Sequence, residues 1–368
     1  MTCEFPLPEK VGSRIIASVN GLDMHVLECG SPDAEHMIVL LHGFPELAYS
    51  WRHQLPELAA ADFYVVAPDL RGYGRTTGDG GDPDADPFDS SMPRLVNDVV
   101  ALVAALGRDT VRAVVGHDFG SPLAGWCALI RPDLFRSLVM MSAPFDGPPS
   151  WPIDSNGPSL RSAIVGLLGQ GREHYLLYLS TPRARDEMNG PAQGMREFLR
   201  GYFYVKSGAW AGNRPYELGS FDADGLAELP PYYVLPAGVG MPEVVAREVA
   251  RAIEATPWLP DDELAYYADE FGHTGFDGGM RWYRAATNPR VVDSLRLFGG
   301  RTIDVPSAFI AGERDWGAYQ VPGALQRMQN SVCTNMLLCE LIPDAGHWVQ
   351  QEKPDAVTEL LLDFTRRL

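Results

Sequence analysis

Lysine is scarce in this sequence of 368 residues. Only Lys10, Lys206 and Lys353 accompany arginine among its 30 basic residues, and 48 acidic residues bring the net charge to −18. This balance argues against nucleic acid and anionic membranes as partners, because phosphate binding needs clustered cations. Arginine in place of lysine, with plentiful alanine, glycine and proline, is typical of a GC-rich bacterial genome.

Cysteine and long apolar runs are also lacking. The cysteines are odd in number and have no metal-ligand spacing, at Cys3, Cys29, Cys127, Cys333 and Cys339; this favours reduced thiols in a cytoplasm. The first ten residues contain no signal-peptide core, and no apolar run is long enough to cross a membrane. We therefore expect a cytoplasmic protein that uses no metal or other cofactor. The sequence leaves a homodimer open.

The aspartate-rich segment 78–89 is the stretch that suggests a calcium site. It lacks the central glycine and the closing glutamate of an EF-hand loop. We interpret it as an exposed, solvated loop.

Apolar runs alternate with helix-period segments at both ends of the chain. Strands are expected at 14–19, 24–29, 37–41, 63–67, 111–115, 138–142, 307–311 and 336–342, and helices at 95–106, 121–130 and 355–366. Asn20-Gly21 predicts a hairpin between the first two strands. The alternation predicts an α/β fold with a mostly parallel, doubly wound sheet.

The rhythm is lost between residues 147 and 288. This segment has proline and glycine punctuation, many aromatic residues, and helix-period stretches at 160–168, 196–204, 243–255 and 263–271. It predicts a mainly helical cap, 147–288, inserted into a core domain formed by 1–146 and 289–368. The stretch 210–241 is longer than a compact cap needs, which leaves the size of the pocket and the substrate open.

A short strand and a helix flank the stretch Gly116-His117-Asp118-Phe119-Gly120. Strand, glycine-bounded turn and helix form the nucleophile elbow, usually G-x-S-x-G, and here the central residue is aspartate. A carboxylate is already ionised at neutral pH and suits displacement at a saturated carbon, which gives an alkyl ester. The stretch therefore predicts an epoxide or a carbon–halogen bond as the electrophile, with a structural turn as the alternative.

The segment His42-Gly43-Phe44-Pro45-Glu46 follows the buried strand 37–41. At this place the backbone N–H groups of Phe44 and Phe119 are expected to form an oxyanion hole. Pro45 is a candidate for a cis peptide bond. An ordinary turn is the alternative interpretation.

Two later loops supply an acid and a base. Asp315 follows the strand 307–311 and His347 follows the strand 336–342, so the order nucleophile, acid, base matches this class of fold. We expect His347 to activate water against the ester and Asp315 to orient its imidazole. Asp146 is a rival position for the acid.

Together these stretches resemble the α/β-hydrolase-fold epoxide hydrolases over nearly the whole chain. The matching motifs are His42-Gly43-Phe44-Pro45, Trp51-Arg52, Asp69-Leu70-Arg71-Gly72-Tyr73-Gly74, the elbow, Gly312-Glu313-Arg314-Asp315 and Gly346-His347-Trp348. The resemblance implies an epoxide and water as substrates and two cap tyrosines that donate to the epoxide oxygen. It carries this role onto Tyr175 in 173–178 and Tyr283 in 275–284, with Tyr178 as a substitute. The expected pocket residues are His42, Pro45, Trp51, Trp282, Trp348 and Tyr178.

Dehalogenases share most of these motifs and are the main alternative. Haloalkane dehalogenases usually have tryptophan after the nucleophile and asparagine in the early loop, where this chain has Phe119 and Phe44. Haloacetate dehalogenases usually have arginine after the nucleophile. Trp282 offers an indole N–H to a halide, but we interpret it as pocket wall. A hydrolase-fold binding protein with an idle triad is the third hypothesis.

Overall fold

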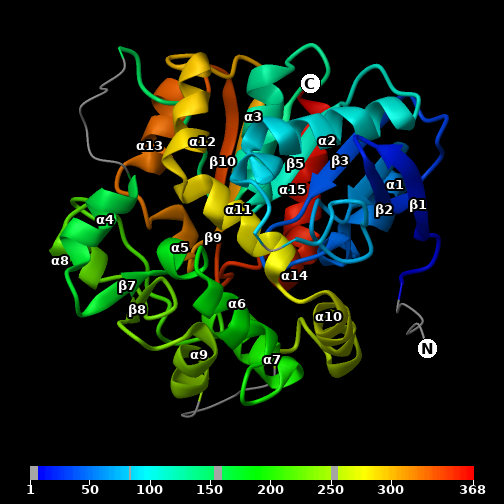
Figure 1. The fold of residues 1–368 in the computed structure, drawn as a ribbon. Helices are drawn as coiled ribbons and strands as arrows, with labels where there is room; N and C mark the ends of the chain where they lie inside the picture. The colour runs from blue at the N-terminus through cyan, green and yellow to red at the C-terminus, as the bar shows by residue number, and fades with distance from the viewer. Residues whose placement is uncertain (1–6, 83, 153–159, 250–255) are drawn as a thin grey trace.

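A central eight-stranded sheet organises the computed structural model, which describes residues 7–82, 84–152, 160–249 and 256–368 (Figure 1). From edge to edge the strands are β1 (Gly12–Val19), β2 (Leu22–Cys29), β4 (Phe63–Pro68), β3 (His36–Leu41), β5 (Ala113–His117), β6 (Leu138–Met141), β9 (Ser307–Gly312) and β10 (Met336–Ile342). The pairs β1–β2 and β2–β4 are antiparallel, and the remaining neighbours are parallel.

Helices cover both faces of this sheet, as its nearly continuous apolar strands require. The helix α1 (Gln54–Ala60) packs against α15 (Pro354–Arg366), and α2 (Met92–Ala105) packs against α3 (Gly120–Ile130). The predicted fold class, a doubly wound and mostly parallel α/β sheet, is confirmed. Shorter elements complete the core: α12 (Pro289–Ser294), α13 (Ala324–Arg327), α14 (Val349–Glu352), the 3₁₀ helices η1 (Ala48–Trp51), η2 (Pro87–Ser90), η3 (Leu295–Phe298) and η4 (Trp316–Ala318), and the π-helix η5 (Met328–Val332).

One predicted strand is displaced. The strand expected at 111–115 runs from Ala113 to His117, because Gly116 and His117 pair with Met140 and Met141 inside the sheet. Val111 forms only an isolated bridge with Phe135. The β-branched run thus marked the beginning of the strand two residues early, and the strand continues directly into the elbow.

An inserted, mainly helical region lies between β6 and β9, below the sheet in Figure 1. It contains α4 (Leu160–Leu168), α5 (Tyr175–Tyr178), α6 (Pro182–Asn189), α7 (Met195–Lys206), α8 (Ala223–Ala227), α9 (Met241–Val249), α10 (Asp261–Thr274) and α11 (Asp277–Thr287), and a ribbon of β7 (Arg172–His174) and β8 (Val234–Pro236). The predicted helix 243–255 appears as α9; residues 250–255 lie outside the described residues. The division at 147 and 288 stays a prediction.

Ion pairs and one backbone contact join this region to the core. Arg52, at the end of η1, pairs with Glu263 on α10 at 2.5 Å, and Arg75 pairs with Glu270 on the same helix at 2.7 Å. A Cβ on Gly72 would lie only 2.6 Å from the Cα of Gly278 on α11. The helix α11 is therefore seated directly on a core loop.

Three predictions concern the whole chain: its cytoplasmic location, a possible homodimer and the absence of a cofactor. In the described part of the chain, no helix combines the length and the apolar character needed to cross a bilayer. Cys29, Cys127, Cys333 and Cys339 carry free thiols, and Cys3 lies outside the described residues. The cytoplasmic location, the homodimer and the absence of a cofactor stay predictions.

Candidate active site

The elbow between β5 and α3 places Asp118 at the carboxyl edge of the sheet. Its φ of 51° lies in the left-handed region, which costs a residue other than glycine about 1–3 kcal/mol. The flanking glycines are required by space: a Cβ on Gly116 would overlap the carbonyl oxygen of Gly120, and one on Gly120 would overlap that of Leu41. Strand and helix therefore meet so closely that only the Asp118 side chain points away from the turn.

The loop after β3 lies against this carboxylate. The backbone N–H of Phe44 donates a hydrogen bond to Oδ1 of Asp118 at 2.8 Å. A Cβ on Gly43 would collide with the same carboxylate, so the close approach requires glycine. The Phe44–Pro45 peptide bond is cis. Phe119 directly follows Asp118, and its part in an oxyanion hole stays a prediction.

His347 lies between two carboxylates that come from distant parts of the chain. Its Nε2 is 3.1 Å from Oδ2 of Asp118, and its Nδ1 is 3.1 and 3.2 Å from the two oxygens of Asp315. The N–H of Gly317 donates to Oδ1 of Asp315 at 2.7 Å and fixes the acid. His347 and Asp315 are almost fully buried. The three predicted residues therefore form one hydrogen-bonded chain.

Opposite charges hold this chain in its ionised form. Burial alone would lower the pKa of His347, as the nearby ammonium of Lys206 does, but Asp315 and Asp118 outweigh both and raise it to about 9. Burial would raise the pKa of Asp118, yet the hydrogen bond and charge of His347 hold it well below its usual range. In the resting site Asp118 is therefore a carboxylate and His347 an imidazolium.

Two buried residues that were not predicted from the sequence, His117 and Glu46, support the backbone of His347. The Nδ1 of His117 donates to Oε2 of Glu46 at 2.5 Å, and its Nε2 donates to the carbonyl oxygen of His347 at 2.7 Å. Both ring nitrogens of His117 thus face oxygen acceptors. Both residues stand in the quoted motifs, beside Pro45 and Asp118, so their positions were visible in the sequence but their contact was not.

Glu352, at the end of α14, is a third buried group that the sequence argument missed. Its Oε2 accepts the N–H groups of Gly208 and Gly346 at 2.8 and 3.0 Å, and its Oε1 accepts that of Trp348 at 3.1 Å. Burial raises the pKa of this carboxyl to about 7. Because Gly346 and Trp348 flank His347, Glu352 fixes the backbone of the base. No motif marks it.

The two predicted cap tyrosines lie near Asp118. Tyr175 begins α5 and Tyr283 lies on α11, with their ring centroids 6.1 Å apart. The ring of Tyr283 packs edge-on against Phe119 and Phe44 at 5.1 and 5.2 Å. Burial, and next the charge of Asp118, raise the pKa of both phenols far above the ordinary value. Both therefore keep their protons and can act as hydrogen-bond donors.

The Tyr175 hydroxyl already has a partner. It donates to Oε1 of Gln320, in the loop after η4, at 3.1 Å. Amide oxygen and nitrogen are assigned from such contacts, so rotation of the amide would turn Gln320 into a donor and free the phenolic proton. Gln320 is 145 residues from Tyr175 and stands in no motif, which is why the sequence did not reveal it.

Comparison with known proteins assigns the family. The α/β-hydrolase fold model matches residues 37–159. Epoxide hydrolase A of Mycobacterium tuberculosis is 34% identical over 364 residues, with 95% of this chain and 96% of that protein covered. The structure of potato epoxide hydrolase I is 30% identical, has a TM-score of 0.75, and covers 98% of this chain and 100% of its own. This chain belongs to the epoxide hydrolase family.

A second solved structure and a second relative agree. An epoxide hydrolase from an endophytic Streptomyces gives a TM-score of 0.78 at 30% identity, covering 98% of this chain and 96% of that one. Epoxide hydrolase 2 of Siraitia grosvenorii is 31% identical over 98% of this chain and 99% of its own length. The resemblance to this family and the hydrolase class are thus confirmed.

Several predicted pocket residues of this epoxide hydrolase family member form hydrogen bonds with the backbone of neighbouring segments. The indole N–H of Trp282 donates to the carbonyl oxygen of Arg71 at 3.1 Å, and that of Trp348 donates to Phe203 at 2.8 Å. The Nε2 of His42 accepts the N–H of Leu70 at 3.0 Å. Trp51 is completely buried, and Pro45 is buried beside Phe44.

Two alternative assignments are not supported by the geometry. The hydroxyl of Tyr178 donates to Glu187 at 2.8 Å and accepts the N–H of Met241 at 3.0 Å. It is engaged inside the inserted region and does not substitute for Tyr175. Asp146 forms an exposed ion pair with Arg327, with nitrogen–oxygen distances of 2.6 and 2.8 Å, whereas Asp315 contacts His347; its role as the acid stays a prediction.

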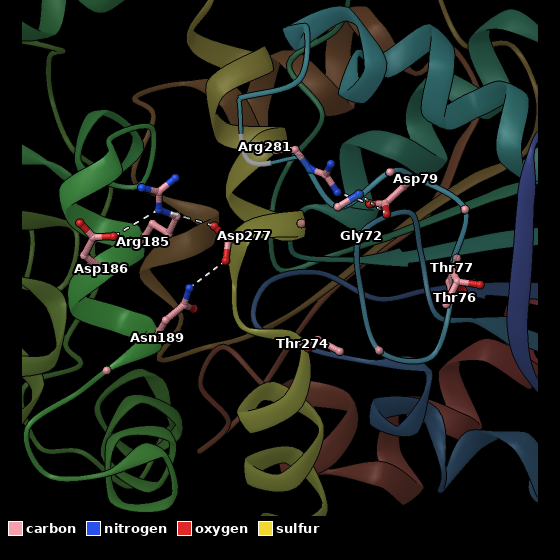
Figure 2. Close-up of a pocket in the computed structure, with 16 residues that line it drawn as sticks. Gly72, Thr76, Thr77, Asp79, Arg185, Asp186, Asn189, Thr274, Asp277 and Arg281 are labelled. Atoms are coloured by element: carbon pink, nitrogen blue, oxygen red, sulfur yellow. Dashed lines mark hydrogen bonds and ion pairs between the residues drawn. The ribbon is translucent and has the colours of Figure 1, made fainter.

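A polar groove of about 1260 Å³ lies apart from the triad, between the core loop 72–81 and the helices α6, α10 and α11. Figure 2 shows Asp277 between Arg185 and Asn189, and Arg281 beside Asp79. These contacts pair the charged side chains of the groove with one another. The aspartate-rich loop thus contacts the inserted region at Asp79 instead of being wholly solvated as predicted.

Proposed function

We propose that this chain opens an epoxide to a vicinal diol through a covalent ester of Asp118. The observation that carries the proposal is the position of the Asp118 carboxylate. One oxygen accepts from Phe44 N–H, the other faces His347, and the protonated phenols of Tyr175 and Tyr283 lie above it. Such a site provides a nucleophile, a base and acids for the two half-reactions.

In the first half-reaction, a carboxylate oxygen of Asp118 attacks an epoxide carbon. The carbon–oxygen bond of the ring breaks, and its electron pair goes to the oxygen, which takes a proton from Tyr175 or Tyr283. The product is a hydroxyalkyl ester and a phenolate. Since the ester carries no negative charge, the carboxylate that helped raise the pKa of His347 is gone. The imidazolium then returns a proton to the phenolate and becomes a neutral base.

In the second half-reaction, neutral His347 takes a proton from water, and the hydroxide adds to the ester carbon. The backbone N–H of Phe44, and in our proposal that of Phe119, stabilise the oxyanion. The intermediate collapses with release of the diol alkoxide, which takes the proton from His347. The new carboxylic acid then protonates His347, and the ionised resting site is restored. Asp315 keeps the imidazole oriented throughout.

Heavy-oxygen water tests the covalent route. In a single turnover with enzyme in excess, the diol should be largely unlabelled and the peptide containing Asp118 should carry the label. Direct attack of water on the epoxide would instead label the diol at once and leave Asp118 unlabelled, which would overturn the mechanism.

The dehalogenase alternative lacks its halide donors. The Trp282 N–H is already bonded to Arg71, and phenylalanines occupy the other two donor positions. Measurement of halide release from haloalkanes separates the two activities. The proposal includes 147–288 as the cap that closes over the nucleophile.

A further inference from the structure

Lys206 is a buried cation without a hydrogen-bond partner. It is the last residue of α7 and is only 5% exposed, although lysine usually lies at the surface. Its Nζ lies 5.3 Å from the ring centroids of Tyr233 and Trp348 and 5.5 Å from that of Tyr202. Within the described residues, no oxygen accepts a hydrogen bond from its Nζ and no carboxylate lies within ion-pair distance.

This ammonium belongs to the same interior as the nucleophile. The backbone carbonyl of Lys206 accepts the N–H of His347 at 2.9 Å, and its neighbour Trp348 directly follows the base. The positive charge of Lys206 helps to lower the pKa values of Asp118 and Asp315. Burial in turn lowers the pKa of Lys206 itself, against the pull of these carboxylates.

A second unpaired donor lies beside it. The hydroxyl of Tyr233 is buried and, among the described residues, has no hydrogen-bond partner. The ring of Tyr233 contacts Lys206 on one side and the ring of Tyr175 on the other, at a centroid distance of 5.1 Å. Tyr233 is therefore in contact with both the Lys206 ammonium and one of the two cap tyrosines.

Three aromatic rings offset only part of the cost of burying this charge. The attraction of a cation to an aromatic ring is weaker than the interactions with water that an ammonium loses when it is buried without a hydrogen-bonded anion. A carboxylate is the natural partner of an ammonium and of a phenolic O–H, because it accepts hydrogen bonds from both. In the free protein this position has no protein carboxylate, so a ligand can supply it.

We propose that Lys206 and Tyr233 bind a carboxylate carried by the substrate, so that this chain acts on epoxy acids. The inference rests on the proposed epoxide chemistry and adds the class of epoxide. The Lys206 cation also allows a second negative charge to approach Asp118, which the nucleophile alone would repel. A neutral ester of the same epoxide leaves Lys206 unpaired, and this difference makes the site selective.

The test compares matched acids and esters. The substrates are terminal epoxides whose carboxylate is separated from the ring by increasing numbers of methylenes, each with its methyl ester. The readout is the ratio of kcat/KM for acid and ester, because effects on the triad that are common to both cancel in the ratio. We expect the best acid to exceed its ester by about tenfold or more, as for a charge-assisted hydrogen bond.

Three variants show which residues cause the preference for the acid over its ester. Lys206→Met keeps the length and apolar contacts of the stem and should lower the ratio about 10- to 100-fold, mainly through KM for the acid. Lys206→Arg keeps the charge and should retain most of the preference, and Tyr233→Phe should lower the ratio less than Lys206→Met. The matched control is Lys10→Met, which removes an exposed lysine and should leave the ratio unchanged.

The results that would overturn the carboxylate site differ from those that would overturn the proposed function. If esters and styrene oxide are hydrolysed with label in Asp118 but no acid in the series is preferred, the carboxylate site is wrong and the mechanism stands. Equal ratios in the wild type and Lys206→Met overturn the site as well, and so does failure of folded Lys206→Arg to retain the preference. If no epoxide is turned over, the proposed function itself fails.

Discussion

In the proposed mechanism His347 is an imidazolium at the start of the first half-reaction and a base in the second, and this determines the effect of replacing it. Attack by Asp118 needs no base, whereas hydrolysis of the ester does. His347→Gln should therefore allow alkylation and block release, so that an adduct of enzyme and epoxide accumulates on Asp118. Mass spectrometry of the peptide containing Asp118 checks this. A folded variant that turns over at the wild-type rate, or that never forms an adduct, contradicts the role of His347.

The same residue makes stability depend on pH. A group whose pKa is raised in the folded state contributes stability that is complete below its unfolded pKa and is lost as pH rises through the folded value. For His347, this window runs from about 6.5, the unfolded value, to about 9. Urea unfolding at increasing pH should show the free energy of unfolding falling across this window more steeply in the wild type than in His347→Gln. Parallel slopes would contradict the buried ion pair.

Tyr175 and Tyr283 should both matter for alkylation, because each can donate to the developing alkoxide. Tyr175→Phe and Tyr283→Phe remove the donor and keep the ring, and each should slow single-turnover alkylation by about 100-fold. The double variant should nearly abolish it. Tyr178→Phe is the matched control, because its hydroxyl is bonded to Glu187, and it should alkylate normally. An unchanged rate in the double variant would remove both phenols from the mechanism.

At the residue scale, the sequence predicted what local geometry dictates. Asp118 was visible because its turn demands glycines at fixed places, and Phe44 because the loop that meets it demands Gly43. The cap tyrosines required the family resemblance, since burial and not local pattern distinguishes them from other tyrosines. Lys206, Gln320 and Glu352 were missed because their contacts join segments far apart in the chain.

Among the elements, α10 is joined to the core by a buried charge pair. Arg52 is almost fully buried, donates to Gln351 at 2.8 Å, lies over the ring of Tyr49, and pairs with Glu263 on α10. Glu263→Gln leaves this guanidinium partly uncompensated and should lower the free energy of unfolding by about 2–3 kcal/mol.

The control is the half-exposed pair of Arg367 and Asp363 on α15. Asp363→Asn should change the free energy of unfolding by less than about 0.5 kcal/mol. Chemical denaturation of both variants checks the difference. Equal losses would show that the Arg52 pair is no stronger than a surface pair.

Elements of the sheet were predicted better than those of the inserted region. Buried parallel strands have long apolar runs with clear ends, so their boundaries moved by two residues at most, and β1 and β2 begin two residues earlier than predicted. The ribbon of β7 and β8 was not predicted, because strands of three residues have no periodicity to detect. The stretch 210–241 contains α8 and β8, so it forms part of the region's own structure.

At the scale of the whole molecule, the topology of the sheet places the residues of the site at one edge. Phe44, Asp118, Asp315 and His347 all follow the carboxyl ends of strands, at β3, β5, β9 and β10, where open α/β sheets bind their ligands. Asp118 and His347 are 229 residues apart in sequence. Their meeting was predictable only because parallel strands end at one edge.

The net charge of −18 predicts how salt affects an anionic substrate. Long-range repulsion is screened by salt, whereas attraction to the buried Lys206 is screened much less. For epoxy acids, kcat/KM should therefore rise with ionic strength, and for their methyl esters it should remain nearly constant. Steady-state kinetics at increasing sodium chloride check this. A fall for the acids alone would show that attraction at the surface dominates.

The left-handed backbone of Asp118 has a consequence for how such a chain evolves. Glycine at this position would relieve the backbone strain, but it would also remove the carboxylate that pairs with the buried His347. The aspartate is retained at a cost that folding does not require. The proposed chemistry, which needs a carboxylate at this turn, explains this strain, and the fold does not.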